Sequence, residues 1–154
     1  MSGAGGGCKV HATAIVIGEV GVLIRGETGS GKSSLARELV AAADARGQHA
    51  ALVADDRVLL QAAGGRLVAS AVDSVAGLLE IRGLGIVRVP HERAAVLGLV
   101  VDLEAEPPRM AEPDGMTVVM NGIALPRITV NFAVGAGVVL WTLGQLRDGF
   151  MTVP

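Results

Sequence analysis

One segment constrains this chain more than any other, because it sets glycines at fixed spacing ahead of a lysine and two serines. Its residues are Gly26, Glu27, Thr28, Gly29, Ser30, Gly31, Lys32, Ser33 and Ser34. The first eight fit the pattern G-x-x-x-x-G-K-[ST] at every fixed position. Glycines in such a turn let backbone N–H groups converge on phosphate oxygens, and a following helix adds the positive end of its dipole. Lys32 can then reach the β- and γ-phosphates of a nucleotide, and Ser33 can ligate Mg²⁺.

The residues around this segment carry the patterns of strands and of one helix, as a phosphate-binding loop requires. Residues 9–17 and 21–24 are rich in Val and Ile and predict strands, whereas residues 32–46 carry apolar side chains at helical spacing. Further apolar runs predict strands over 50–54, 58–61, 67–70, 78–81, 86–89, 96–103, 116–120 and 127–130, and a helix over 132–147. Residues 104–115 contain three prolines and predict a loop. The order of elements predicts an α/β fold, with a largely antiparallel stretch after the first unit.

Composition excludes several classes of function. Hydrophobic residues make up 51% of the chain but aromatic residues only 2%, which argues against a stacking platform for single-stranded nucleic acid. The net charge of −2 provides no attraction toward nucleic acid or acidic membranes. Residues 132–146 carry no charge, yet they are too few to span a bilayer. We therefore expect no nucleic-acid partner and no membrane partner, and we expect this segment to be a buried helix or one that faces a second subunit.

The length and the N-terminal residues predict one intracellular domain. Residues 1–8 read as a flexible leader and residues 9–154 as a single domain. The leader lacks the charged and apolar regions of a secretory signal. The chain has one cysteine, Cys8, so it cannot form an internal disulfide, which fits a reducing compartment. We therefore predict a cytoplasmic location.

Four further residues are candidates for chemistry, and each has a plainer interpretation. Asp55 and Asp56 follow an apolar run, where a carboxylate beside the glycine-rich loop can hold Mg²⁺ or accept a proton from an attacking hydroxyl. The same pair could instead form a turn or a helix cap. His11 could simply be a histidine whose hydrogen bonds are satisfied. Glu80 lies within an apolar run, where an acid is costly to bury unless it is paired or bound to metal, or it could face solvent on an exposed strand.

Together these residues resemble the catalytic domain of bacterial HPr kinase/phosphorylase. The resemblance covers residues 9–130 and includes His11, the glycine-rich loop, the acidic pair and the segment Leu-Glu-Ile-Arg-Gly-Leu-Gly-Ile at 79–86, which looks like the signature loop of that family. It implies a P-loop fold of the HPr kinase and phosphoenolpyruvate carboxykinase type, with a mixed sheet and flanking helices. It also implies assembly into a homo-oligomer, a hexamer in the family. The chain looks like a minimal version that lacks the N-terminal domain of the family.

The resemblance implies a role for each matching residue. Residues 26–34 would hold ATP, and Ser33, Glu80 and Asp55 would bind Mg²⁺. Asp56 would be the general base for a serine hydroxyl of HPr, and His11 would lie beside it. Arg82 would shape the catalytic surface.

Two further arginines, Arg109 and Arg127, are candidates for a phosphate contact, or are surface arginines. The later loop of the family is reduced here to residues 125–128. The resemblance therefore supports the kinase direction more than the phosphorylase direction.

Three functions remain open on the sequence. The first is an ATP-dependent protein-serine kinase acting on HPr. The second is a nucleotide-binding module that regulates a partner through assembly without turnover, although such a module has no need of His11, Asp56 and Glu80 together. The third is a small-molecule kinase, which is weaker because no separate substrate lid is evident in so short a chain.

Overall fold

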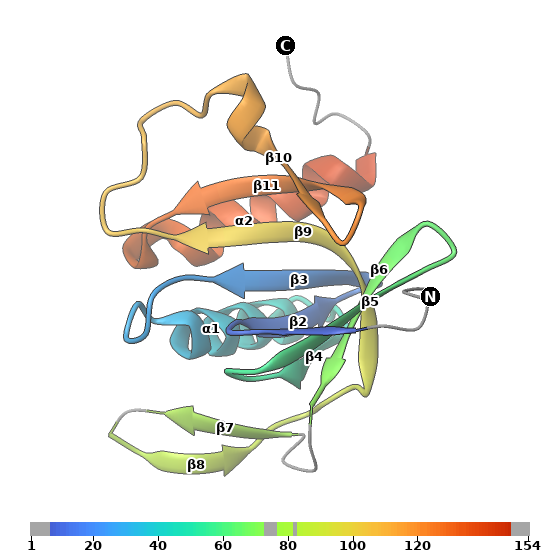
Figure 1. Cartoon of the computed structure of the whole chain (residues 1–154). Coiled ribbons are helices and arrows are strands. Elements are labelled where there is room, and N and C mark those ends of the chain that lie inside the picture. The colour runs from blue at the N-terminus through green and yellow to red at the C-terminus, as the bar shows by residue number, and fades with distance from the viewer. Residues whose placement is uncertain (1–6, 73–76, 82, 149–154) are drawn as a thin grey trace.

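A computed structural model describes residues 7–72, 77–81 and 83–148. These described residues form one mixed sheet, a separate hairpin and two α-helices (Figure 1). The elements in chain order are β1 (Cys8–Val10), β2 (Thr13–Ile17), β3 (Val20–Arg25), α1 (Lys32–Ala45), β4 (Ala50–Ala54), β5 (Val58–Ala63), β6 (Arg66–Ala71), β7 (Leu78–Ile81), β8 (Gly85–Arg88), β9 (Ala94–Leu103), the 3₁₀ helix η2 (Pro113–Met116), β10 (Thr117–Met120), β11 (Ile123–Val130) and α2 (Phe132–Asp148). This arrangement confirms the predicted α/β class with a mixed sheet and flanking helices.

The sheet places four strand ends at one edge. Its order is β1-β5-β6-β9-β3-β2-β4, and β11 pairs with β9. Strands β3, β9 and β11 run parallel to one another, and β4 runs in the same direction because the antiparallel β2 lies between it and β3. The loops that follow β3, β4, β9 and β11 therefore meet at the same edge, which is where open α/β sheets bind ligands.

Both helices cover the same face of the sheet, where they lie behind the strands in the view of Figure 1. Alternate residues of β2, β3 and β9 point toward the helices, since successive side chains of a strand face opposite sides. Leu35 and Leu39 of α1 and Val139 of α2 complete this core and are fully buried. A second apolar cluster lies on the other face, where β5, β6 and β10 cover the central strands. With cores on both faces, the central strands form a rigid base for the loops at their ends.

Several element boundaries differ from those that the sequence predicts. Residues 9–17 do not form one strand: β1 ends at Val10 and pairs with β5, whereas β2 begins at Thr13 and pairs with β3 and β4. His11 and Ala12 lie at the break. Cys8, which the sequence places in the predicted leader, lies in β1 and pairs with Leu60 of β5.

Strand β11 begins at Ile123, four residues before the predicted start. Pro126 is the last residue of β11 to pair with β10, and Arg127 is the first to pair with β9. The N–H that proline lacks therefore falls where β11 changes partners, a position at which a sheet tolerates proline. The predicted loop over 104–115 contains the start of η2. Among the described residues, no helix is long and apolar enough to cross a membrane.

Candidate active site

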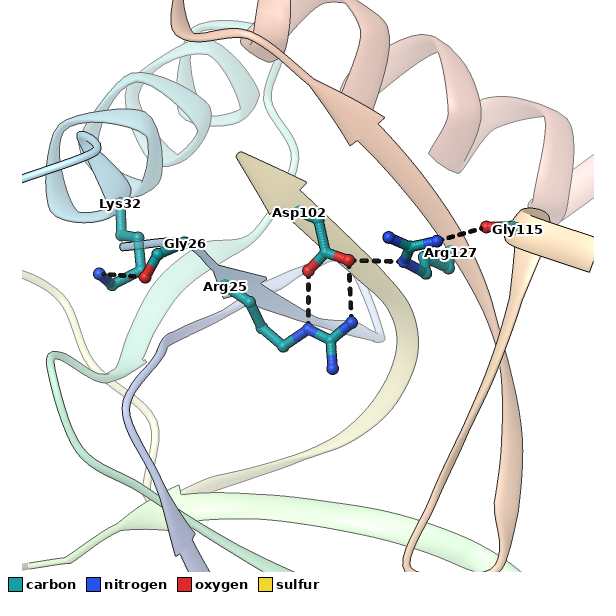
Figure 2. Close-up of polar contacts among 6 residues, drawn as sticks. All are labelled: Arg25, Gly26, Lys32, Asp102, Gly115 and Arg127. Atoms are coloured by element: carbon teal, nitrogen blue, oxygen red, sulfur yellow. Dashed lines mark hydrogen bonds and ion pairs between the residues drawn. The ribbon is translucent and has the colours of Figure 1, made fainter. Parts of the chain in front are cut away.

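The glycine-rich loop joins β3 to α1 at the edge of the sheet, as the sequence predicts. Gly29 and Gly31 adopt left-handed backbone angles, φ 83° and 101°, which side chains other than glycine rarely tolerate. Lys32 is the first residue of α1 and is only 8% exposed. Its Nζ donates to the carbonyl oxygen of Gly26 at 3.0 Å (Figure 2). It also donates to the carbonyl oxygen of Glu27 at 3.2 Å. The loop is thus closed around the lysine ammonium, with the start of α1 behind it.

Asp55 links three elements directly beside this loop. It follows the last residue of β4, and its Oδ1 accepts hydrogen bonds from Ser33 Oγ at 2.7 Å and Thr13 Oγ1 at 2.9 Å. The Thr13 side chain is completely buried. Thr13 was not predicted as a site residue, and its only signal in the sequence is a hydroxyl side chain at the start of an apolar run. These bonds fix the carboxylate next to the serine that is expected to ligate Mg²⁺.

Asp56, the next residue, differs from Asp55 in backbone conformation and in exposure to solvent. Its backbone is left-handed, φ 71°, and its carbonyl accepts from Ala12 N at 3.3 Å. This geometry turns the side chain toward solvent, where it is 67% exposed and lies 3.1 Å from His11 Nδ1. The break between β1 and β2 therefore places His11 beside Asp56.

A cavity of about 570 Å³ brings most of the predicted residues together. Its walls are Thr13, Thr28, Gly29, Ser30, Gly31, Lys32, Ser33, Ser34, Asp56, Glu80 and Phe132. Glu80 reaches it from β7, an exposed position on the separate hairpin. Cavities of this size suit small-molecule ligands. The arrangement can place anionic phosphates between the loop amides and Lys32 on one side and oxygen donors on the other.

The described residues contain no group of three or more His, Cys, Asp or Glu side chains that could hold a metal ion by themselves. Ser33 Oγ and the Asp55 carboxylate are nevertheless adjacent hard oxygen donors. Mg²⁺ in nucleotide sites is usually bound by one or two carboxylates together with substrate phosphates and water. The chemistry of this donor set therefore fits Mg²⁺ when nucleotide phosphates complete it.

Two predicted arginines, Arg109 and Arg127, do not line this cavity. Arg82 lies outside the described residues. Arg109 is exposed in the loop after β9. Arg127 points to the face of the sheet opposite the helices, because the next residue, Ile128, packs against the core on the helix side. Gly26 and Glu27 differ from their neighbours in the loop, since their carbonyl oxygens accept from Lys32 and neither residue lines the cavity.

Arg127 instead belongs to a cluster with Arg25 and Asp102 on three adjacent strands (Figure 2). Asp102 accepts from Arg25 Nε at 2.7 Å and Arg25 Nη2 at 2.8 Å, and from Arg127 Nε at 2.5 Å. Arg127 also donates to the carbonyl of Gly115 at 2.9 Å. Because Arg25 directly precedes Gly26, this cluster fixes the strand end from which the glycine-rich loop starts.

The cluster changes the acidity of its members. Burial alone would raise the pKa of the Asp102 carboxyl, but hydrogen bonds and the charges of Arg25 and Arg127 outweigh burial, and the pKa lies below its usual range. The hydrogen bond to Asp102 raises the pKa of Arg25, against the opposing effect of burial. This cluster was not predicted from the sequence. Arg25 and Asp102 are 77 positions apart, so no local sequence pattern indicates that they pair.

Comparisons with known proteins identify the family of this chain. A family model described as the HPr Serine kinase C-terminal domain matches residues 6–135. The HPr kinase/phosphorylase of Geobacillus thermodenitrificans is 38% identical over 138 residues, which cover 79% of this chain and 41% of that protein. That of Brevibacillus brevis is 40% identical over 133 residues, with the same two coverages. This chain thus spans 41% of the length of each of these curated relatives.

A solved structure shows the same fold. The HPr(Ser) kinase/phosphatase from Coxiella burnetii aligns with a TM-score of 0.76 at 27% identity, over 92% of this chain and 97% of that chain. The predicted fold type is therefore confirmed. By the extent of the family match, the chain belongs to the HPr serine kinase C-terminal domain family.

Proposed function

We propose that this chain transfers the γ-phosphoryl group of ATP to a serine hydroxyl of the phosphocarrier protein HPr. Membership of the family supports a phosphotransferase, and the relatives named above are described as HPr kinases. The observation that carries the proposal is the shared cavity, in which Lys32, Ser33, Asp56 and Glu80 face one space. Because ATP is the proposed donor, we expect the chain to act in the cytoplasm.

In this proposal the loop holds the phosphates. Backbone N–H groups of the glycine-rich turn and the N-terminal end of α1 bind the phosphate oxygens, and Lys32 exchanges its carbonyl partners for the β- and γ-phosphates. Ser33, Asp55 and Glu80 would hold Mg²⁺, which when bound supplies positive charge that the transition state of phosphoryl transfer requires. The Thr13 hydroxyl keeps Asp55 in position.

Asp56 is the proposed general base. The serine oxygen of HPr forms the new bond to the γ-phosphorus while the bond to the β–γ bridging oxygen breaks, and ADP leaves. The serine proton passes to the Asp56 carboxylate. His11 Nδ1, 3.1 Å from Asp56, would help to orient that carboxylate toward the hydroxyl. Exposure of both side chains suits an acceptor that is itself a protein, because a folded partner must reach the base from outside.

The direct test is an assay with labelled ATP and purified HPr. The kinase proposal expects label on a serine of HPr, located by fragmentation of the intact phosphoprotein. An alternative is a nucleotide-binding module that regulates a partner without turnover. Nucleotide binding with no label on HPr, under conditions where a known HPr kinase labels the same preparation, contradicts the kinase proposal and supports the module.

We also propose that the chain assembles with copies of itself through the outer face of α2. Three apolar side chains at helical spacing share this face and are exposed, with Val134 at 56%, Val138 at 39% and Trp141 at 65%. Light scattering at micromolar concentration should give an oligomer, and Trp141→Glu should shift it toward monomer. A wild-type monomer would contradict this assignment, and an oligomer unaffected by Trp141→Glu would place the interface elsewhere.

A further inference from the structure

A second cavity, of about 730 Å³, lies on the other side of the glycine-rich loop. It is formed by that loop, by the residues that follow β9 and by the N-terminus of α2. Gly29, Ser30 and Phe132 line both this cavity and the phosphate cavity described above. The two spaces therefore adjoin along the loop, and one elongated ligand can occupy both.

The order of strands decides which end of the ligand enters each space. Asp55 and Asp56 follow β4, on one side of β3, whereas β9 and β11 lie on the other side (Figure 1). If the γ-phosphate faces Asp56, the rest of the nucleotide must extend away from the acids across the loop. The only neighbouring strand ends in that direction, within the described residues, are those of β9 and β11.

Phe132 offers this region an exposed ring. It begins α2, is 40% exposed and packs against the loop, since a Cβ added to Gly31 would lie 3.0 Å from a ring carbon. Asn131 accepts from Val134 N at 3.1 Å and so fixes the turn from which the ring projects. An aromatic face held in this way can stack on a nucleobase, and such stacking tolerates any base because each has a π-face.

Among the described residues, the second cavity is lined by carboxylates and by no Lys or Arg side chain, whereas Lys32 lines the first cavity. Glu27, Glu104 and Glu106 line the second cavity, and the backbone N–H of Glu104 donates to the Val130 carbonyl at 3.0 Å, joining the two loops. Carboxylates repel phosphates, but they accept hydrogen bonds from hydroxyl and amino groups. A ligand with one anionic end and one end rich in neutral donors therefore orients itself across the loop.

We propose that this second cavity binds the nucleoside half of the nucleotide, with the base against Phe132 and the ribose hydroxyls toward Glu104 and Glu106. The inference rests on the proposed function only in assuming that the phosphates occupy the glycine-rich loop. It does not depend on which acceptor receives the phosphoryl group.

The test compares ATP with tripolyphosphate, which has the phosphates but no nucleoside. Phe132→Ala in the full chain should weaken ATP binding about 5- to 150-fold and weaken tripolyphosphate binding much less, since the ring also lines the phosphate cavity. Phe132→Leu keeps apolar bulk against Gly31 and should cause a smaller but still ATP-selective loss. Met110→Ala removes another exposed apolar side chain, outside the cavity, and should affect neither ligand.

A second arm tests the ribose contacts. Wild-type protein should bind ATP more tightly than 2′,3′-dideoxy-ATP, and the double variant Glu104→Ala/Glu106→Ala should reduce this difference. Equal loss of ATP and tripolyphosphate binding in Phe132→Leu, or no loss in either Phe132 variant, would overturn the assignment of the base. An unchanged preference over the dideoxy nucleotide would overturn the assignment of the ribose.

The outcome is separable from that of the kinase proposal. Selective loss of ATP binding in the Phe132 variants supports the subsite even if HPr is never labelled. Labelling of HPr combined with unselective Phe132 variants removes the subsite and leaves the kinase proposal standing.

Discussion

Asp56 and Asp102 both lie at the edge of the sheet where the parallel strands end, yet their surroundings are opposite. Asp102 is 14% exposed and receives three hydrogen bonds from two guanidinium groups. Asp56 is 67% exposed, has a left-handed backbone and has an exposed histidine beside it. A carboxylate held by two arginines is committed to the structure, whereas one that faces a cavity with a single exposed neighbour can accept a proton. The comparison therefore separates a residue that builds the site from one proposed to act in it.

Asp55 lies between these extremes and shows how the two regions connect. It is held by Ser33 and Thr13, but both partners are hydroxyl groups, which can exchange a hydrogen bond for a metal contact without leaving a buried charge unpaired. The Asp102 cluster cannot exchange partners as easily, because loss of the carboxylate leaves two guanidinium groups facing each other. We therefore expect Asp102 to contribute to stability, and Asp55 and Asp56 to act in phosphoryl transfer, at the same edge of the sheet.

The largest effect on phosphoryl transfer is expected from Lys32, the cation that lines the same cavity as Asp56. Lys32→Ala removes the ammonium that donates to the carbonyl oxygens of Gly26 and Glu27. In the proposed complex this ammonium moves from the carbonyl oxygens to the phosphate. We expect transfer to HPr to fall by more than about 10³-fold, because the γ-phosphate loses its main fixed charge. Arg37→Ala, an exposed cation on the same helix, is the matched control and should retain full activity. If Lys32→Ala and the control variant were equally active, the assignment of the phosphate-binding site to the glycine-rich loop would be wrong.

A smaller effect is expected from Glu80. Glu80→Gln keeps the shape of the side chain and removes the charge proposed to help hold Mg²⁺. The Mg²⁺ concentration that gives half-maximal transfer should rise about tenfold, the cost of roughly 1.4 kcal/mol in metal affinity. Glu19→Gln changes an exposed glutamate between β2 and β3 and serves as control. An unchanged Mg²⁺ requirement would indicate that Glu80 merely faces solvent on β7.

Asp102→Asn should change stability and leave chemistry nearly intact. We expect the free energy of unfolding at pH 7 to fall by about 2–3 kcal/mol, seen as a lower denaturant midpoint with unchanged slope. Transfer by the folded fraction should stay within a few fold of wild type. Asp114→Asn, an exposed acid in η2, should leave the midpoint unchanged.

The pH dependence of this effect has a definite sign. The pKa of Asp102 is lowered in the folded chain, so its contribution is complete above the unfolded value of about 4 and is lost as pH falls through the folded value. The difference in stability between wild type and Asp102→Asn should therefore be largest near neutral pH and shrink in acid below about pH 4. A difference that grows on acidification would contradict the assigned ion pairs.

The sequence predicted what is encoded locally. Glycine spacing, a preceding apolar run and a following helical pattern located the loop between β3 and α1, and the position of Asp55 and Asp56 after β4 followed from one apolar run. Long-range pairing was not accessible in this way. The Arg25–Asp102–Arg127 cluster joins three strands that are distant in the chain, and only their register brings the side chains together.

The break between His11 and Thr13 was missed for a related reason. Residues 9–17 have continuous strand propensity, but β1 and β2 pair with different strands, so tertiary pairing overrides the local pattern. The break is what places His11 beside Asp56. The left-handed backbone of Asp56 was also not predictable from its type alone, although aspartate tolerates that conformation better than most residues.

The most direct test of the account is single-turnover phosphorylation of HPr by Asp56→Asn and Asp102→Asn, measured side by side with nucleotide affinity by titration. Asp44→Asn, an exposed acid of α1, is the control, and Asp55→Asn tests the assignment within the pair. We predict that Asp56→Asn slows transfer about 10²–10⁴-fold with nearly unchanged nucleotide affinity, while folded Asp102→Asn transfers at close to the wild-type rate. A larger loss in Asp55→Asn than in Asp56→Asn, or equal rates for Asp56→Asn and wild type, would contradict the assignment of Asp56 as the base.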